Sequence, residues 1–327
     1  MQDSSIIASS KRLEENLNGI NQQSRNYIKD IITLVNKEVG INKIRSIILF
    51  GSQRAKSSEA TAVSDCDLLI IFKNRVSNHH IKEIEKYFIA LEIKHNFRES
   101  SKKLPKKILS VISQTTGIFI SHFLTKMKYW EQANFHKIFR VNKVFSKAFA
   151  PKNIVLGNIV LNSTTLYGEE IIEKIRPKIR ITFIEIVKST IMNLMISFFS
   201  IIISLFKKLD PTKYQLTAIK WSLKAANFYC YRDSESLVNI TKRFISFERE
   251  KKQKRATAFF NDFINLRKSP FNDLNFMIRS PIRIIKIHMK AITYKKLWME
   301  SRSPTKQWRD HISIEHTTPD HTRSLRI

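Results

Sequence analysis

The sequence predicts an α+β domain followed by an all-helical domain. Short apolar runs rich in β-branched and aromatic residues, typical of buried strands, occur at 47–50, 68–72 and 117–125. Between these runs, apolar residues recur at helical spacing. After Glu169 the strand pattern disappears and only long helical periods remain. This change of pattern predicts four parts: a polar segment over 1–24, the α+β domain over 25–170, the helical domain over 171–300 and a disordered tail over 301–327.

The elements of the first domain follow from this spacing in chain order. Apolar residues at helical positions predict a helix over 26–39, which leads into the strand ending at Phe50. A second helix, over 78–96, is expected to cross over from the strand at 68–72. The remaining expectations are a polar loop at 53–64, a short basic helix at 106–114, a strand at 117–125, helical structure at 130–149 and a short apolar segment at 154–161.

Two motifs at the ends of the first two strands predict chemistry. The first strand ends in Gly51-Ser52, and Asp65 and Asp67 stand at the head of the second. Gly51 allows a tight turn and a close approach of the backbone to a ligand, and free N–H groups near Ser52 would favour an anion. Because strand side chains alternate, both aspartates should face the same way. Two close carboxylates repel unless a cation lies between them, and Mg²⁺ prefers such oxygen ligands. The alternative is a surface hairpin with a solvated Asp-x-Asp turn.

These motifs resemble the signature of a known family. Phe50-Gly51-Ser52 and Ser64-Asp65-Cys66-Asp67-Leu68 resemble the nucleotidyltransferase superfamily, which has the DNA polymerase beta-like fold. The likeness is closer to its minimal and kanamycin-type members, and it covers about residues 25–170. It implies a mixed sheet with flanking helices, Mg²⁺, and transfer of a nucleoside monophosphate from a triphosphate such as ATP. By position, Gly51 and Ser52 would hold the triphosphate, and Asp65 and Asp67 would bind the metal.

The sequence departs from the family pattern in two places. Small members often read Gly-Ser-x-Ala-Arg-Gly, whereas here Arg54 comes one place early and Lys56 replaces the glycine. Either cation is a candidate phosphate contact or a solvated charge. Active members also carry a third carboxylate on a later strand, and the strand at 117–125 contains none. His122 or Ser121 occupies the corresponding place, so His122 is a candidate general base or a structural residue.

Charge and cysteine content bound the partners. The net charge of +29 comes from 57 basic and 28 acidic residues. Such a field would attract RNA or DNA, although a basic surface alone has the same charge. It disfavours a cationic aminoglycoside as the acceptor. Cys66 and Cys230 provide no disulfide framework, and the N-terminus lacks a signal-peptide pattern, so a reducing, cytoplasmic location is expected.

The helical part contains one strongly apolar stretch. Residues 191–206 are mostly apolar but too short for a membrane span, and they include Asn193 and several serines. A buried core helix is the better interpretation. In the tail, His311, His316 and His321 fall five residues apart, without the spacing of a metal site.

The sequence therefore supports one main hypothesis and two alternatives. The main hypothesis is a Mg²⁺-dependent nucleotidyltransferase that releases pyrophosphate and modifies an unidentified acceptor. The first alternative is a catalytically silent nucleotide- or nucleic-acid-binding module of the same fold, because the third carboxylate is missing. The second is a toxin–antitoxin or regulatory protein that modifies another protein.

Overall fold

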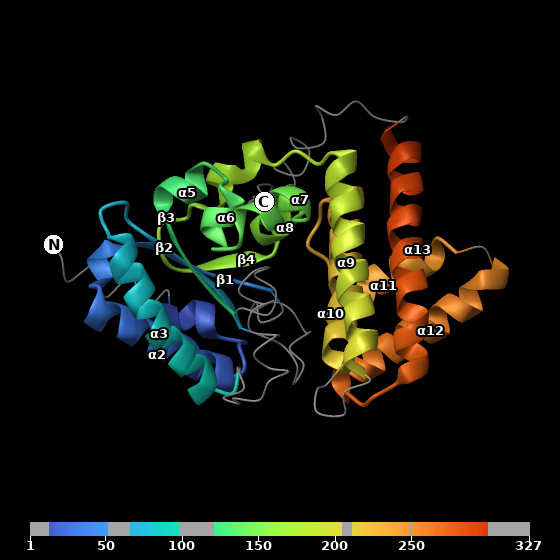
Figure 1. The fold of residues 1–327 in the computed structure, drawn as a ribbon, viewed down its shortest axis with the longest axis horizontal. Coiled ribbons are helices and arrows are strands. Elements are labelled where there is room, and N and C mark those ends of the chain that lie inside the picture. The colour runs from blue at the N-terminus through green and yellow to red at the C-terminus, as the bar shows by residue number, and fades with distance from the viewer. Residues whose placement is uncertain (1–12, 52–65, 98–120, 205–210, 249, 300–327) are drawn as a thin grey trace, which may run out of the picture.

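The computed structural model describes residues 13–51, 66–97, 121–204, 211–248 and 250–299. It contains a four-stranded mixed sheet with helices on both faces, followed by a group of long helices (Figure 1). The α+β prediction and the helical region after it are therefore confirmed. Sequence expectations at 53–64 and 106–114, and the tail histidines, lie outside the described residues.

The sheet has the order β3-β2-β1-β4. Strand β1 pairs antiparallel with β2 on one side and with β4 on the other, whereas β2 and β3 are parallel. The strands are β1 (Ile44–Phe50), β2 (Asp67–Phe72), β3 (His122–Lys126) and β4 (Ser163–Gly168). A parallel pair needs a crossover connection, and the predicted helix, α3 (Asn78–Lys94), lies within it.

One face of the sheet is covered by α2 (Gln22–Glu38) and α3 (Figure 1). Both helices begin at a side-chain cap, since Asn21 accepts from the Ser24 N–H and Ser77 accepts from the His80 N–H. Alternate residues of β2, such as Leu68 and Ile70, pack beneath them. The residues just before α2 also join this core, because Leu17 and Ile20 are buried.

The other face of the sheet is covered by short helices and then by the long ones. The short helices are α5 (Met127–Glu131), α6 (Phe135–Ile138), α7 (Lys143–Ala148) and α8 (Lys152–Leu161). The long region contains α9 (Phe183–Ser204), α10 (Pro211–Tyr231), α11 (Leu237–Ser246), α12 (Glu250–Lys268) and α13 (Leu274–Met299). Two 3-10 turns, η1 (Ile41–Lys43) and η3 (Ile172–Lys178), complete the described elements.

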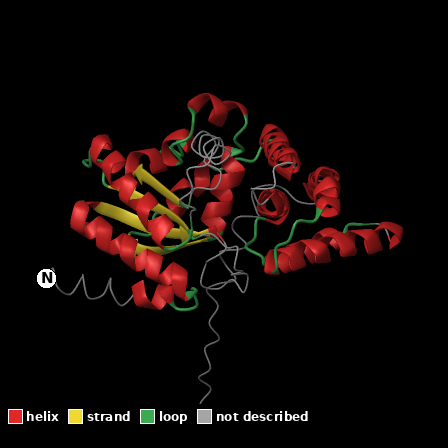
Figure 2. Cartoon of the chain, turned by 60° about the horizontal axis from the view of Figure 1, so that its bottom comes forward, coloured by secondary structure: helices red, strands yellow, loops and turns green. Residues whose placement is uncertain are grey.

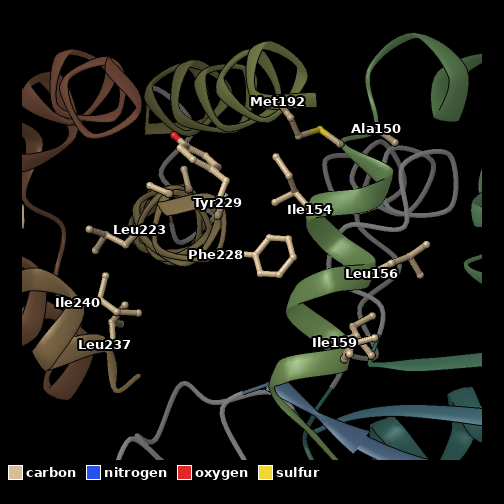
Figure 3. Close-up of a cluster of buried hydrophobic side chains, with 14 of the residues drawn as sticks. Ala150, Ile154, Leu156, Ile159, Met192, Leu223, Phe228, Tyr229, Leu237 and Ile240 are labelled. Carbon is tan, nitrogen blue, oxygen red and sulfur yellow. The ribbon is translucent and has the colours of Figure 1, made fainter. Parts of the chain in front are cut away.

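A continuous hydrophobic core joins this face of the sheet to the long helices. It includes Leu69 and Ile71 of β2 and extends to α10. At its centre Phe228 of α10 lies against α8 (Figure 3). A Cβ added at Gly157 would lie 1.9 Å from the Phe228 ring, so only glycine fits there. The core therefore crosses the predicted domain boundary near residue 170, and that boundary stays a prediction.

Helix α9 differs from the expected buried core helix. Its polar residues face inward: the Gln215 amide donates to Ser197 Oγ at 2.7 Å, and the Ser200 hydroxyl donates to the Pro211 carbonyl at 2.7 Å. Its outward residues are apolar instead, with Ile191 and Phe198 41% and 53% exposed. Figure 2 shows some of the long helices nearly end-on and one along its length. By length and hydropathy α9 is the one described helix that passes the test for a membrane span, with 44% of its window buried.

The helical structure expected at 130–149 is present as the short helices α5, α6 and α7. They are separate because Ala133 and Arg140 adopt left-handed backbone angles, φ 50° and 53°, which end a helix. Strand β4 was not predicted at all. Its residues are partly polar, and it pairs with β1 more than one hundred residues earlier in the chain.

Candidate functional site

Gly51 and Asp67 meet at one corner of the sheet. Phe50, the last residue of β1, pairs with Asp67, the first residue of β2. Gly51 follows with φ 84°, in the left-handed region that favours glycine. A Cβ built on Gly51 would lie 2.4 Å from Asp67 Oδ2, too close for any side chain. The structure thus brings together one predicted nucleotide-binding residue and one predicted metal ligand.

Strand alternation decides which face this corner serves. Asp67, Leu69 and Ile71 point to the face covered by α8 and the long helices, and Asp67 itself is half-buried. Cys66 points the other way and is fully buried beneath α2 and α3, as expected from the sequence. The carboxylate of Asp67 is therefore on the side of the sheet that faces the helical region.

A row of four residues crosses the sheet at this level. Ser163 of β4 pairs with Phe50, Phe50 pairs with Asp67, and the Leu68 N–H donates to the Ser121 carbonyl at 2.8 Å. Phe50 and Phe123 have ring centroids 6.0 Å apart, which fixes their common face. Alternation along β3 then puts Ser121 on this face too, beside Asp67. Ser121, 4% exposed, is thus the one of the two candidates, Ser121 and His122, that lies on the same face as Asp67.

Ser163 is a residue that sequence reasoning missed. Its hydroxyl is buried and has no hydrogen-bond partner among the described residues. A buried polar atom without a partner is uncommon in folded proteins and calls for an explanation. Ser163 pairs with Phe50, the residue before Gly51. Its hydroxyl can therefore donate to a ligand at the corner where the sequence predicts the triphosphate. No pattern of residues in the sequence marked it, because its strand was not predicted.

His122 lies on the opposite face of the sheet from Asp67. It pairs with Leu68 and packs under α3, where its Nδ1 lies 2.7 Å from Glu92 Oε1 and its ring 5.2 Å from that of Phe88. Both side chains of the His122–Glu92 pair are 3% exposed. The structure therefore does not bring His122 together with Asp67, and this geometry favours the structural role for His122 over that of general base.

Tyr27 of α2 lies near this buried pair. Its hydroxyl is buried and has no hydrogen-bond partner in the described part of the chain. Burial raises the pKa of Tyr27 well above its ordinary value, and the negative charges of Glu92 and Asp67 raise it further. The phenol thus stays protonated at any ordinary pH. Tyr27 and Glu92 are therefore two buried polar side chains between the sheet and the helices α2 and α3.

The other predicted site residues lie outside the described residues. These are Ser52, Arg54, Lys56 and Asp65. Within the described ranges no three His, Cys, Asp or Glu side chains gather as a metal site. Asp67 alone offers a described hard oxygen ligand at the corner, which suits Mg²⁺ held by one or two carboxylates and substrate phosphates.

Comparison with known proteins gives a likeness of fold. No protein-family model matches the chain, and no curated protein does. A similar solved structure is the crystal structure of spectinomycin adenyltransferase AAD(9) from Enterococcus faecialis with ATP and spectinomycin. The two chains are 8% identical, with a TM-score of 0.47, over 81% of this chain and 98% of that one. The likeness is between folds alone.

Proposed function

We propose that this protein is a Mg²⁺-dependent nucleotidyltransferase. It would move a nucleoside monophosphate from a triphosphate such as ATP to an acceptor and release pyrophosphate. The observation that carries the proposal is the contact between Gly51 and Asp67, in which a left-handed glycine leaves room for a carboxylate at the end of a strand. A structural turn alone would not require the aspartate at that point.

The proposed roles follow from the residue types. Gly51 lets the backbone approach the triphosphate, and Ser52 supplies a hydroxyl and N–H groups to its oxygens. Ser163, whose buried hydroxyl lacks a described partner, would donate to the same ligand. Asp65 and Asp67 would hold Mg²⁺, which when bound neutralises charge on the phosphates and on the leaving pyrophosphate. Arg54 and Lys56 remain candidate phosphate contacts. Catalysis would consist mostly of positioning and charge stabilisation.

A second candidate is a nucleotide-binding module without catalysis. The observation in its favour is Ser121, a hydroxyl beside Asp67 where active members carry a carboxylate. A serine hydroxyl is a poor base near neutral pH, so the acceptor would not be activated there. His122, the other candidate base, packs against Glu92 on the opposite face. Such a module would bind nucleotide and Mg²⁺ but release no pyrophosphate.

The test is pyrophosphate release with each of the four nucleoside triphosphates and Mg²⁺. RNA, DNA and a protein extract serve as acceptors in separate reactions, because the basic surface makes a nucleic acid one candidate acceptor. The Asp67→Asn variant should lose release, since it removes a metal ligand but keeps the side-chain shape. Asp273→Asn is the control: Asp273 caps α13 through the Phe276 N–H, far along the chain, and asparagine caps equally well.

The outcomes separate the two candidates. Release that Asp67→Asn abolishes and Asp273→Asn preserves would support the transferase. Triphosphate binding without release by the wild type would favour the silent module. Equal release from all three proteins would exclude Asp67 from the reaction.

A further inference from the structure

A cavity of about 320 Å³ lies at the opposite end of the sheet from the Gly51–Asp67 corner. Strand β3 runs parallel to β2, with His122 opposite Leu68 near the corner and Lys126 opposite Phe72 at the far end. Lys126 lines the cavity together with residues of α3, α5 and α6. The cavity is therefore a separate feature, about four strand residues or roughly 13 Å from the proposed nucleotide site.

Lys126 is the unusual residue of this cavity. It is 7% exposed, and its ammonium has no hydrogen-bond or ion-pair partner in the described part of the chain. A largely buried lysine side chain is normally paired or binds a ligand. The Lys126 ammonium is not among the fully buried polar atoms of the described residues, so it opens onto the cavity and can meet an anion there.

The charged residues that line the cavity all have the same sign. Besides Lys126 they are Lys137 and Arg140, and His136 lines the cavity next to Lys137. No carboxylate is among the described lining residues. The pKa of His136 is lowered mainly by burial and further by the charges of Lys137 and Lys143. Glu85 lies outside the cavity and holds Arg140 through a 2.6 Å ion pair, so this guanidinium is fixed in place.

The N-terminus of α3 adds backbone donors. Asn78, the first residue of this 17-residue helix, lines the cavity. The Ser77 side chain caps the His80 N–H, which leaves the first N–H groups of the helix for another acceptor. Helix N-termini attract anions through these N–H groups and the helix dipole. This terminus therefore acts on the same site as Lys126.

We propose that this cavity binds the phosphate group of a small phosphorylated molecule. Lys126 and the α3 N-terminus would hold the phosphate, and Arg140 and Lys137 would balance its second charge. Tyr129 and Ile81 provide an apolar wall for the organic part. A volume of about 320 Å³ is at the lower end for small-molecule sites, which suits a compact ligand such as a sugar phosphate rather than a polymer.

The test is calorimetric titration of the full chain carrying Asp67→Asn, in EDTA, so that metal-dependent binding at the other site does not contribute. The probes are inorganic phosphate and ribose 5-phosphate. Lys126→Met removes the ammonium that lines the cavity, whereas Lys143→Met removes a nearby exposed charge that does not line it. We expect binding to weaken at least tenfold in Lys126→Met and less than twofold in Lys143→Met. Tighter binding of ribose 5-phosphate than of phosphate would identify an organic ligand.

Thermal unfolding is a second test, which does not depend on a heat signal from binding. Without phosphate, Lys126→Met should melt at the same temperature as the parent or higher, because the variant removes one of several cations gathered around the cavity. Added phosphate should raise the melting temperature of the parent and leave Lys126→Met unchanged. The proposal is overturned if neither probe binds at millimolar concentration, or if both lysine variants lose binding equally.

A second inference rests on the outward face of α9, independently of the cavity. Seven large apolar residues on this helix are 37–66% exposed: Phe183, Ile184, Val187, Ile191, Met195, Phe198 and Ile202. From Ile184 onward they recur at spacings of three or four residues, the pattern of a helix that packs against another helix. By their exposed fractions these side chains leave on the order of several hundred Å² of apolar surface uncovered, as large as the largest apolar patch of a typical monomer.

The neighbouring helix α13 continues this surface. Figure 1 shows α9 and α13 side by side, and the buried contact between Asn193 and His288 confirms it. Leu274, Ile278, Ile282, Ile285 and Met289 of α13 are 40–62% exposed and follow the same spacing. By these exposed fractions the two stripes together are on the order of the roughly 800 Å² that each partner contributes to a standard interface.

We infer that this face joins two copies of the chain through α9 and α13. Its area suits a symmetric dimer, and a two-fold pairing of the same patch needs no further partner. A membrane span is disfavoured, because the inward side of α9 bonds to α10 through Ser197 and Gln215 and could not leave the bundle alone. Lys286 of α13 is exposed on this face, four residues after Ile282 and three before Met289, so the dimer would have to leave its ammonium at the edge of the contact.

Sedimentation velocity of the full chain from 1 to 100 µM tests this inference. We expect a dimer for the wild type and a monomer for the double variant Ile191→Asp/Phe198→Asp. Val144→Asp is the matched control, since Val144 of α7 is 75% exposed and lies off this face. It should remain dimeric. A monomeric wild type at 100 µM overturns the inference, and binding of that monomer to phosphatidylglycerol vesicles would assign the face to lipid instead.

Discussion

Gly51→Ala perturbs the proposed site through one methyl group. The backbone at Gly51 has φ 84°, which costs a residue with a Cβ about 1–2 kcal/mol. The new Cβ would stand 2.4 Å from Asp67 Oδ2, whereas ordinary contacts begin near 3.4 Å. Asp67 is half-buried and can rotate, so we expect the carboxylate to move by about 1 Å and the fold to survive.

The effect on function should exceed the effect on stability. A displacement of about 1 Å in a catalytic group can cost about 100-fold in rate. Gly51→Ala should therefore lower pyrophosphate release about 100-fold and the free energy of unfolding by only about 1–2 kcal/mol. Release is measured with saturating triphosphate and Mg²⁺, and stability by urea unfolding followed by circular dichroism.

Gly40→Ala is the matched control for backbone strain. Gly40 has φ 90°, and a Cβ there would lie 3.1 Å from Asn42 Oδ1, at the end of α2 and away from the corner. It should lose similar stability and keep its pyrophosphate release. The reasoning is refuted if the two variants retain equal activity, because the contact with Asp67 would then have no functional consequence.

Three further predictions concern the fold. Gly157→Ala should lower the free energy of unfolding by about 1–3 kcal/mol, because its methyl group overlaps Phe228, and Phe228→Leu in the same chain should restore part of the loss in urea unfolding. Burial lowers the pKa of His288 to about 3, below its ordinary 6.5, so the unfolded chain binds the extra proton. Stability should therefore fall as pH drops below 6.5, by about 2 kcal/mol between pH 7 and 5, and not in His288→Gln. Glu248 is 7% exposed and pairs with Arg283 at 3.0 Å and Lys290 at 2.5 Å, so Glu248→Gln should cost about 3 kcal/mol in the same assay; a loss below 1 kcal/mol would contradict this.

The first half of the sheet and its helices were predictable from local pattern. The apolar runs ending at Phe50 and Phe72 are continuous, since both faces of these strands are buried, and the helix between β2 and β3 has a regular apolar stripe. Asp67 begins β2 where the sequence suggests. Its contact with Gly51 could be expected too, because the two strands are neighbours in the chain. These features depend on residues close together in the chain.

Strand β4 and the face of His122 were not predictable in this way. Ser163–Gly168 becomes a strand by pairing with β1. Only glycine fits at position 168, because φ is 83° and a Cβ there would lie 2.2 Å from the Arg45 carbonyl oxygen. A shift of one residue along β3 exchanges its two faces, so the sequence left both Ser121 and His122 open. Glu92 was the missed signal: it falls on the buried stripe of α3, four residues after Phe88, where an acid needs a partner.

The orientation of α9 also escaped the sequence pattern. Mean hydropathy marks the helix as apolar but does not say which side meets the bundle. The inward side carries Ile186, Met192 and Ile196 together with two serines that bond to α10: Ser197 accepts from Gln215, and Ser200 donates to the Pro211 carbonyl. A second set of apolar residues lies on the outward side, unlike the usual arrangement of a surface helix.

The central claim is that the Gly51–Asp67 corner binds a nucleoside triphosphate together with Mg²⁺. The most direct measurement is equilibrium binding of each triphosphate with and without Mg²⁺, to the wild type, Asp67→Asn and Asp273→Asn. We predict binding that Mg²⁺ strengthens and that Asp67→Asn weakens at least tenfold, with Asp273→Asn unchanged. Binding that is the same in all three proteins, or that does not respond to Mg²⁺, would contradict the claim.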